Sequence, residues 1–127
     1  VRPLETYLGD INLFAVFDNE DDVSNMTPNF DAVAKLDGQG LIISSSSDQY
    51  DFVSRYFCPK YGINEDPVTG SAHTTLIPYW SEKLNKISLT AKQVSKRGGE
   101  LFCENTDNRV LIGGNAVLYM KGVIEID

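Results

Sequence analysis

The side chains most able to do chemistry lie in one short segment, residues 65–72, which reads Glu-Asp-Pro-Val-Thr-Gly-Ser-Ala. It stands immediately before an apolar stripe of helical spacing. A helix that begins this way has free backbone N–H groups and the positive end of its dipole, and both favour an anion. Asp66 and Ser71 flank the turn, where they could contact a bound carboxylic acid. The predicted substrate-binding residues are Asp66, Thr69, Gly70 and Ser71, with Asp66 also the candidate catalytic residue.

Each of the two flanking side chains also has a purely structural interpretation. Asp66 before Pro67 could be only an N-cap, stabilising the helix by about 1 kcal/mol. Ser71 could be an ordinary serine in the first helical turn. In the functional interpretation, Asp66 accepts a hydrogen bond from a substrate amine or hydroxyl, and Gly70 lets the backbone approach the ligand closely. Both interpretations are open at this point.

Other reactive residue types in the chain do not form a recognisable site. His73 is the only histidine, and on the predicted helix it lies beside the apolar stripe, so a structural or exposed role is expected. One histidine and two distant cysteines, Cys58 and Cys103, lack the spacing of metal ligands. Neither a nucleophile elbow nor a phosphate loop with its lysine is present. We therefore expect no metal site.

Length and charge restrict the class of protein. The 127 residues suffice for one domain with its own core, so a single domain over residues 1–127 is expected. The net charge of −7 argues against a nucleic-acid or anionic-membrane partner, which would require a basic face. Two cysteines do not indicate a secreted disulfide scaffold, and no apolar run could span a bilayer. We expect a cytoplasmic protein with reduced thiols.

The pattern of apolar residues predicts mostly strands and one long helix. The helix is predicted from an apolar stripe at intervals of four: Val68, Ala72, Leu76, Trp80 and Leu84. Strands are predicted at residues 12–17, 41–46, 51–58, 87–94, 99–104, 109–112 and 116–126. The pattern as a whole predicts an α+β fold, in which a mixed or antiparallel curved sheet wraps around one long central helix.

Two segments before residue 40 receive a more local prediction. Thr27 and Pro28 are typical of an N-cap and a first helical residue, so a short helix is predicted from Pro28. The acidic run at residues 18–22 is predicted to be a solvated loop.

Several motifs together resemble a known family. The sequence is similar to the carboxy-terminal half of PhzF-like phenazine-biosynthesis proteins, which are related in fold to diaminopimelate epimerase. The resemblance extends from about Ile11 onward, and Asp-Pro-x-Thr-Gly-Ser-Ala is its most specific part. The motifs that carry it are Arg55-Tyr56-Phe57-Cys58-Pro59, residues 65–72, Pro78-Tyr79-Trp80, Gln93 with Arg97-Gly98-Gly99, and residues 109–114.

The resemblance implies a protein of two similar halves, each a helix enclosed by a mixed sheet, with the active site between them. The implied chemistry is cofactor-free isomerisation, in which a carboxylate moves a proton on a small cyclic amino-acid-like substrate. Asp66 and Ser71 are then the substrate-contacting residues of this half. The glutamate base, a neighbouring histidine and a glycine-asparagine-proline turn belong to the amino-terminal half, and none of them is found here. Epimerase relatives carry a catalytic cysteine near this turn, whereas this chain carries Asp66, so a two-thiol mechanism is not expected.

Two functions are compatible with these observations. In the first, the chain is the substrate-binding half of an isomerase for a small carboxylate, inactive without its amino-terminal half. A second copy could replace that half in a homodimer, although no glutamate-bearing turn is present. In the second, the chain is a stand-alone, non-catalytic anion-binding or assembly module. The first function predicts exposed apolar surface where the companion docks, and the reading frame upstream of Val1 distinguishes the two.

Overall fold

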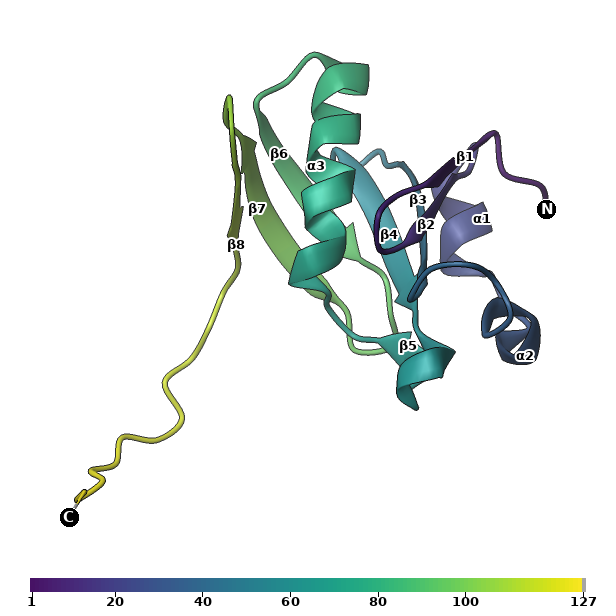
Figure 1. Cartoon of the computed structure of the whole chain (residues 1–127). Helices are drawn as coiled ribbons and strands as arrows, with labels where there is room; N and C mark the ends of the chain where they lie inside the picture. Colours follow the sequence, from purple (N-terminus) through teal and green to yellow (C-terminus); the bar gives the residue numbers. More distant parts are fainter. Residues whose placement is uncertain (127) are drawn as a thin grey trace.

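A computed structural model describes residues 1–126; Asp127, the last residue of the predicted domain, lies outside them. The strands are β1 (Glu5–Leu8), β2 (Leu13–Val16), β3 (Leu41–Ser46), β4 (Phe52–Phe57), β5 (Glu65–Asp66), β6 (Ser88–Gln93), β7 (Gly99–Asn105) and β8 (Val110–Gly113) (Figure 1). The helices are α1 (Glu20–Ser24), α2 (Phe30–Val33), the 3-10 turn η1 (Pro59–Tyr61) and α3 (Gly70–Leu84). No helix within residues 1–126 has the length and apolar character needed to cross a membrane.

The strands form one mixed sheet in the order β1-β2-β3-β4-β6-β7-β8, with β5 added beside β4. The predicted α+β class is therefore confirmed. The pairs β2–β3 and β4–β6 are parallel, and the other pairs are antiparallel. Crossovers between parallel strands are almost always right-handed. Because the two parallel pairs run in opposite directions, this rule places α1 and α2 on one face of the sheet and α3 on the other.

The burial pattern confirms this three-layer arrangement. Successive residues of the central strands point to opposite faces, as in Ile42 and Ile43 of β3, both fully buried. One set packs with α3 in a cluster of Phe14, Val16, Ile42, Phe52, Tyr56, Cys58, Ala72, Leu76, Ile77, Trp80, Leu89, Ala91, Leu101 and Cys103. The other set packs with α1 and α2 in a cluster of Ala15, Phe17, Val23, Val33, Ile43, Val53 and Phe57.

Helix α3 contacts elements at both ends of the sheet order. Its residues approach β6, β7 and β8 on one side. On the other side, Glu5 of β1 accepts hydrogen bonds from Tyr79 at 3.1 Å and from Lys83 at 2.8 Å. The stripe that predicted the helix is its buried side, since Ala72, Leu76 and Trp80 are all buried.

Most central elements agree with the sequence prediction, but two local predictions before residue 40 are wrong. Thr27 is not the N-cap of the short helix; α2 begins at Phe30, and the Asn29 side chain accepts from the N–H of Ala32. The acidic run is not entirely a loop, because α1 begins at Glu20. Asn19 caps α1, and acidic residues in a first turn favour the helix dipole.

The two ends of the chain also differ from the prediction. No element is predicted before residue 12, yet Glu5–Leu8 forms the edge strand β1. A strand is predicted at residues 116–126, but this segment has no regular structure and leads away from the sheet (Figure 1). The segment is rich in apolar residues, and nothing in the described chain pairs with them. Val117 and Tyr119 are 93% and 98% exposed.

Candidate functional site

The segment at residues 66–71 is positioned at its start by strand β5. In the antiparallel ladder with β4, Asp66 lies opposite Tyr56. The chain then turns into α3, whose N-cap is Thr69 and whose first residue is Gly70. Asp66 therefore lies ahead of the cap, and the interpretation of Asp66 as the N-cap itself is wrong.

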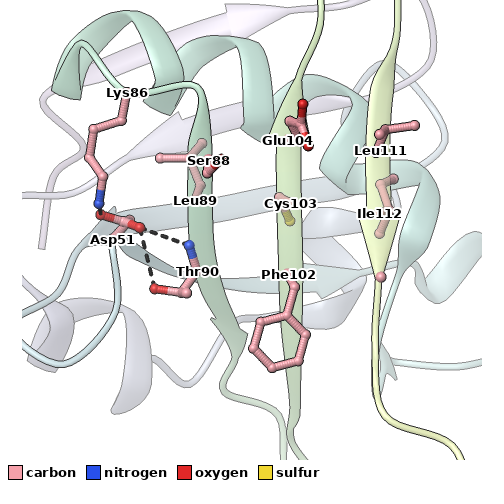
Figure 2. A pocket seen from close by; sticks show the side chains of 11 residues that line it. Asp51, Lys86, Ser88, Leu89, Thr90, Phe102, Cys103, Glu104, Leu111 and Ile112 are labelled. Carbon is pink, nitrogen blue, oxygen red and sulfur yellow. Dashed lines mark hydrogen bonds and ion pairs between the residues drawn. The ribbon is translucent and has the colours of Figure 1, made fainter.

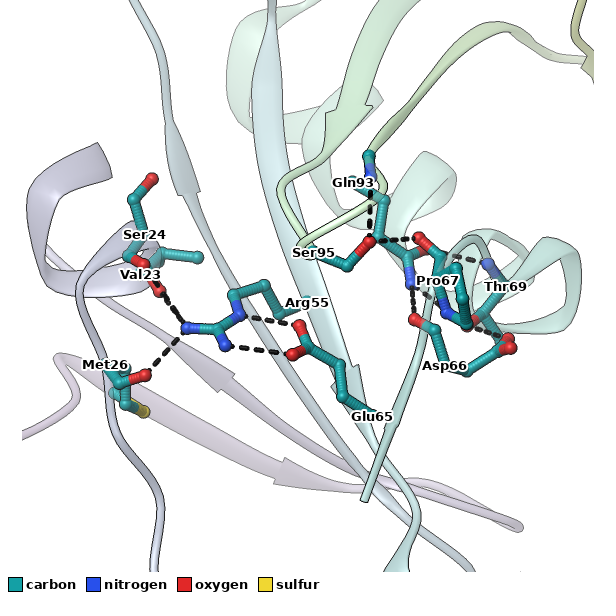
Figure 3. Close-up of polar contacts among 11 residues, drawn as sticks. Val23, Ser24, Met26, Arg55, Glu65, Asp66, Pro67, Thr69, Gln93 and Ser95 are labelled. Carbon is teal, nitrogen blue, oxygen red and sulfur yellow. Dashed lines mark hydrogen bonds and ion pairs between the residues drawn. The ribbon is translucent and has the colours of Figure 1, made fainter. Parts of the chain in front are cut away.

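Thr69 occupies the N-cap position without capping the helix through its side chain. Its hydroxyl donates to Asp66 Oδ2 at 2.5 Å, and its N–H donates to Gln93 Oε1 at 2.8 Å (Figure 3). A threonine at an N-cap ordinarily accepts a hydrogen bond from a first-turn N–H. Here the N–H groups of Gly70 and Ser71 receive no such cap from the described residues. Both residues are exposed, so an anion can reach the open first turn.

Gln93, at the end of β6, holds the bend in this conformation. It is 1% exposed, and besides accepting from Thr69 its amide donates to the Asp66 carbonyl at 2.8 Å and to Thr69 Oγ1 at 3.1 Å. Ser95 adds a hydrogen bond to the Pro67 carbonyl at 2.7 Å (Figure 3). The backbone from Asp66 to Thr69 is therefore fixed by side chains from a distant part of the chain.

An ion pair fixes the other side of the same segment. Arg55 of β4 donates from two nitrogens to Glu65 at 2.7 and 3.0 Å, in a bidentate pair beside Asp66. The guanidinium also donates to the carbonyls of Ser24 and Met26 near the end of α1. The two charged side chains are 12% and 19% exposed. This pair ties β5 to β4 and to the helical layer on the opposite face of the sheet.

Two hollows flank the first turn of α3. One, of about 330 Å³, is lined by Ser71 together with Asn12 and Tyr56. The other, of about 550 Å³, is lined by Gly70 together with Arg97 and the glycine pairs at 98–99 and 113–114. The predicted site thus lies between two open depressions rather than inside a closed core.

A larger hollow lies elsewhere. It measures about 610 Å³ and covers the outer face of β6, β7 and β8, between the Lys86–Asp51 ion pair and the apolar side chains of Phe102 and Leu111 (Figure 2). None of the predicted site residues lines it. We therefore place the candidate site at the first turn of α3, because of the chemistry of its residues. The larger volume of the hollow on this face is not a reason to place it there.

His73 is buried beneath the site rather than part of it. Its side chain is fully buried, and Nδ1 lies 2.7 Å from the carbonyl oxygen of Thr69. Nε2 has no hydrogen-bond partner within residues 1–126. Burial lowers the pKa of His73, so the ring is neutral at physiological pH. The structural role expected for His73 is confirmed, and the alternative of an exposed position is wrong.

The two cysteines are free thiols, in agreement with the prediction of reduced cysteines, and both are buried. Burial raises the pKa of Cys58, and it raises the pKa of Cys103 to about 11. Both therefore remain protonated at neutral pH, and thiolates are the form that a cysteine nucleophile needs. Within residues 1–126, no three side chains of His, Cys, Asp or Glu gather as metal ligands would.

The structure brings some of the predicted site residues together and separates others. Asp66 and Thr69 are in direct contact. Thr69 is buried, whereas Ser71 faces the 330 Å³ hollow. The sequence motifs include Tyr56 and Gln93, but the roles of these two residues at the site were not predicted. A signal for Gln93 existed: Leu89, Ala91 and Gln93 form the buried side of β6, and the glutamine is its one strongly polar member.

The sequence matches a known family over nearly its whole length. Residues 4–122 match the PhzC-PhzF family, described as phenazine biosynthesis-like protein. An uncharacterized isomerase of Pseudomonas aeruginosa is 50% identical over 114 residues, which are 90% of this chain and 44% of that protein. The chain therefore spans less than half the length of this relative.

Two solved structures agree with this assignment. A PhzF-family protein of Enterococcus faecalis is 53% identical, with a TM-score of 0.89 over 94% of this chain and 46% of its own. A putative PhzC/PhzF phenazine biosynthesis protein of Clostridium difficile is 48% identical, with a TM-score of 0.88 over 99% of this chain and 49% of its own. From its motifs, its fold and these matches, the chain belongs to the PhzC-PhzF family of phenazine biosynthesis-like proteins.

Proposed function

We propose that this chain is the carboxy-terminal, substrate-binding half of a cofactor-independent isomerase that moves a proton on a small carboxylate. The observation that carries the proposal is the open first turn of α3. The threonine at the N-cap is turned away from the helix, towards Asp66 and Gln93. The N–H groups of Gly70 and Ser71 are thereby left for the carboxylate of a substrate.

Asp66 is the proposed catalytic residue of this half. One carboxylate oxygen accepts from Thr69, and the other has no hydrogen-bond partner among residues 1–126. A carboxylate held at one oxygen and free at the other can accept a proton or a hydrogen bond from a substrate in a defined direction. In this proposal Thr69 orients Asp66, while Gly70 and Ser71 contact the substrate carboxylate.

The second catalytic group would come from a companion half, either an amino-terminal domain or a second copy. Support comes from the share of the two solved relatives that the chain covers, 46% and 49%. It comes also from exposed apolar side chains beside the site and at the chain ends, including Leu4, Leu8, Ile11, Leu118 and Met120. The contacts of α3 with both edge strands support the predicted sheet wrapped around one helix.

Proton exchange tests the proposal, because it can be detected whatever the product of the reaction is. The protein expressed from its native reading frame is incubated in D2O with a panel of small carboxylic acids, and deuterium incorporation is followed by NMR. We expect at least one acid to exchange a carbon-bound proton. Asp66→Ala should slow this exchange by about 10²- to 10⁴-fold. The free energy of unfolding should change by no more than about 1 kcal/mol, since one partly exposed hydrogen bond is lost.

Asp48→Asn, which alters a carboxylate in the β3–β4 loop, serves as the matched control and should exchange like the unaltered protein. Residues 1–127 alone should bind acids without exchanging them. Unchanged exchange in Asp66→Ala, or a loss of several kcal/mol in stability, would show that Asp66 is chiefly structural. Exchange by residues 1–127 alone would show that no companion half is needed. If upstream sequence adds nothing and no acid exchanges, the alternative of a stand-alone anion-binding or assembly module is favoured.

A further inference from the structure

His73 is an imidazole buried in the core between α3 and the sheet. Its side chain is fully buried, and its ring centroid lies 5.9 Å from that of Phe52. Nε2 has no hydrogen-bond partner in the described part of the chain. A buried polar atom without a partner lowers stability, so a histidine here needs a reason that packing does not supply.

The other ring nitrogen supplies that reason. Nδ1 lies 2.7 Å from the carbonyl oxygen of Thr69, four residues earlier. Side chains of a helix lean towards its N-terminus, which lets a residue reach the carbonyl one turn before it. Because a carbonyl oxygen can only accept, Nδ1 carries the proton of the neutral ring and Nε2 does not. The ring therefore acts here through a single donor, Nδ1–H.

The Thr69 carbonyl receives this bond in addition to the one that the helix gives it. As the N-cap residue, Thr69 accepts the first intrahelical hydrogen bond, and the His73 ring uses the second lone pair of the same oxygen. The remaining polar atoms of Thr69 also have partners, since its N–H donates to Gln93 and its hydroxyl to Asp66 (Figure 3). Gln93 thus holds the peptide group before Thr69, and His73 holds the one after it.

The peptide group after Thr69 contains the N–H of Gly70. In a planar trans peptide the C=O and the N–H point in opposite directions, and no peptide bond of the described chain is cis. Since the Thr69 carbonyl points to a buried ring, the Gly70 N–H points away from the core. Glycine permits rotations of this peptide that other residues resist, and a Cβ atom at position 70 would meet no other atom within 4 Å. Crowding therefore does not hold this peptide in place, whereas the bond to His73 does.

We propose that His73 is a positioning residue for the anion site, and that its bond to the Thr69 carbonyl keeps the Gly70 N–H directed at the bound carboxylate. The inference rests on the proposed function, because it assumes that the substrate carboxylate binds at the first turn of α3. His73 does not touch the ligand and acts only through Thr69. Loss of its donor therefore weakens carboxylate binding even where the core remains well packed.

Acetate is the probe, because it carries a carboxylate and almost nothing else. It is titrated into isotope-labelled protein expressed from its native reading frame, and the amide resonances of Gly70 and Gly62 are followed by NMR. The Gly62 N–H donates to the Pro59 carbonyl at 3.1 Å, so its resonance serves as the internal control. In the unaltered protein we expect the Gly70 resonance to shift until it saturates, while that of Gly62 stays in place.

Two substitutions of His73 separate its hydrogen bond from its packing. His73→Phe keeps a ring and removes Nδ1–H, so acetate should bind about 5- to 10-fold more weakly, the size of one hydrogen bond. His73→Asn places an amide nitrogen near the position of Nδ1 and should bind acetate within about twofold of the unaltered protein. Thermal melting should rank the two variants in the opposite order, because asparagine leaves a cavity and a buried oxygen without a partner. A merely structural role predicts instead that affinity follows stability.

Ile77→Val is the matched control in the core. Ile77 is fully buried on the same helix, so its shortening should lower the melting temperature slightly and leave acetate affinity unchanged. If His73→Phe folds poorly, His73→Leu removes the same donor with a smaller side chain.

The results distinguish the two proposals. If acetate shifts the Gly70 resonance of the unaltered protein but binds His73→Phe or His73→Leu as tightly, the positioning role is overturned and the proposed function stands. The same conclusion follows if His73→Asn weakens acetate binding as much as His73→Phe does. If acetate leaves the Gly70 resonance of the unaltered protein in place, the carboxylate site of the proposed function is overturned, and the positioning role with it.

Discussion

The bend at residues 66–71 and the segment at residues 114–126 differ in where their partners lie. The bend is held by hydrogen bonds from Gln93 and Ser95, which lie more than 20 residues further along the chain. The segment pairs with no strand of the described chain, and its apolar residues are exposed. The conformation of the bend is therefore determined by other residues of this chain. The conformation of residues 114–126, in contrast, is not determined by residues 1–113.

This difference has a consequence for how the site could work. A bend fixed by buried side chains is preorganised, so the N–H groups of Gly70 and Ser71 need little rearrangement to bind an anion. The segment, by contrast, offers exposed apolar side chains and an unpaired backbone, which are the features that another sheet can bind. Altering each region in turn tests this difference.

The largest change in stability is expected when the bend loses its buried partner. Gln93→Leu removes the acceptor for the Thr69 N–H and the donor to the Asp66 carbonyl. Because these groups then lack partners in a buried environment, we expect the free energy of unfolding to fall by about 3 kcal/mol. Urea denaturation followed by circular dichroism measures this change.

The control for this variant is Gln49→Leu, the same substitution on an exposed loop, which should stay within about 0.5 kcal/mol of the unaltered protein. Equal stability of the two variants would show that Gln93 is dispensable. The bend would then be held by its own sequence, and the contrast with residues 114–126 would lose its basis.

The sequence predicts those elements whose stabilising contacts follow from a regular local pattern. The apolar stripe of α3 is the clearest example, because burial of one repeating face determines it. The position of Asp66 and the exposed first turn also agree with the motif. What the pattern could not give was the orientation of Thr69. Threonine is a common N-cap, and only the distant Gln93 and the nearby Asp66 carboxylate turn its hydroxyl away from the helix.

The same reasoning explains the errors at the chain ends. Glu5–Leu8 is too short and too polar to be recognised as a strand, and it is stabilised by tertiary contacts with Phe14 and Tyr79. Residues 116–126 have a better strand pattern, but a strand needs a partner. The strength of the sequence pattern and the observed structure are thus reversed at the two ends, because pairing depends on what lies beside the segment and not on its own composition.

A smaller effect is expected at the edge strand β1, which is intermediate between the two regions. Its Glu5 forms hydrogen bonds with Lys83 and Tyr7, which lower the pKa of the Glu5 carboxyl from 4.5 to about 2. An acid whose pKa is depressed on folding stabilises the fold above its unfolded pKa. This contribution is therefore complete above about pH 4.5 and is lost as the pH falls through about 2.

The ion pair is exposed, so the effect should be slight and should be concentrated in β1. Amide exchange of residues 5–8, measured between pH 5 and pH 2 and referred to the intrinsic rates, should show β1 opening more readily as Glu5 is protonated. Glu5→Gln lacks the titrating group, and its β1 should open equally at both limits. A pH dependence that persists in Glu5→Gln would assign it to another group.

The smallest effect on stability, close to none, is expected when residues 114–127 are removed. Since the described part of this segment lies away from the sheet and buries little apolar surface, the free energy of unfolding of the remaining chain should change by less than about 0.5 kcal/mol.

Association is expected to respond differently. If the segment binds a companion half or a second copy, light scattering after gel filtration should show that the shortened chain associates less than residues 1–127. A stability loss of about 2 kcal/mol or more would mean that the segment packs on its own domain, and the contrast with the bend would then fail. Equal association by both chains would instead place the docking surface on the exposed apolar residues of β1 and its neighbours, where Leu4, Leu8 and Ile11 lie.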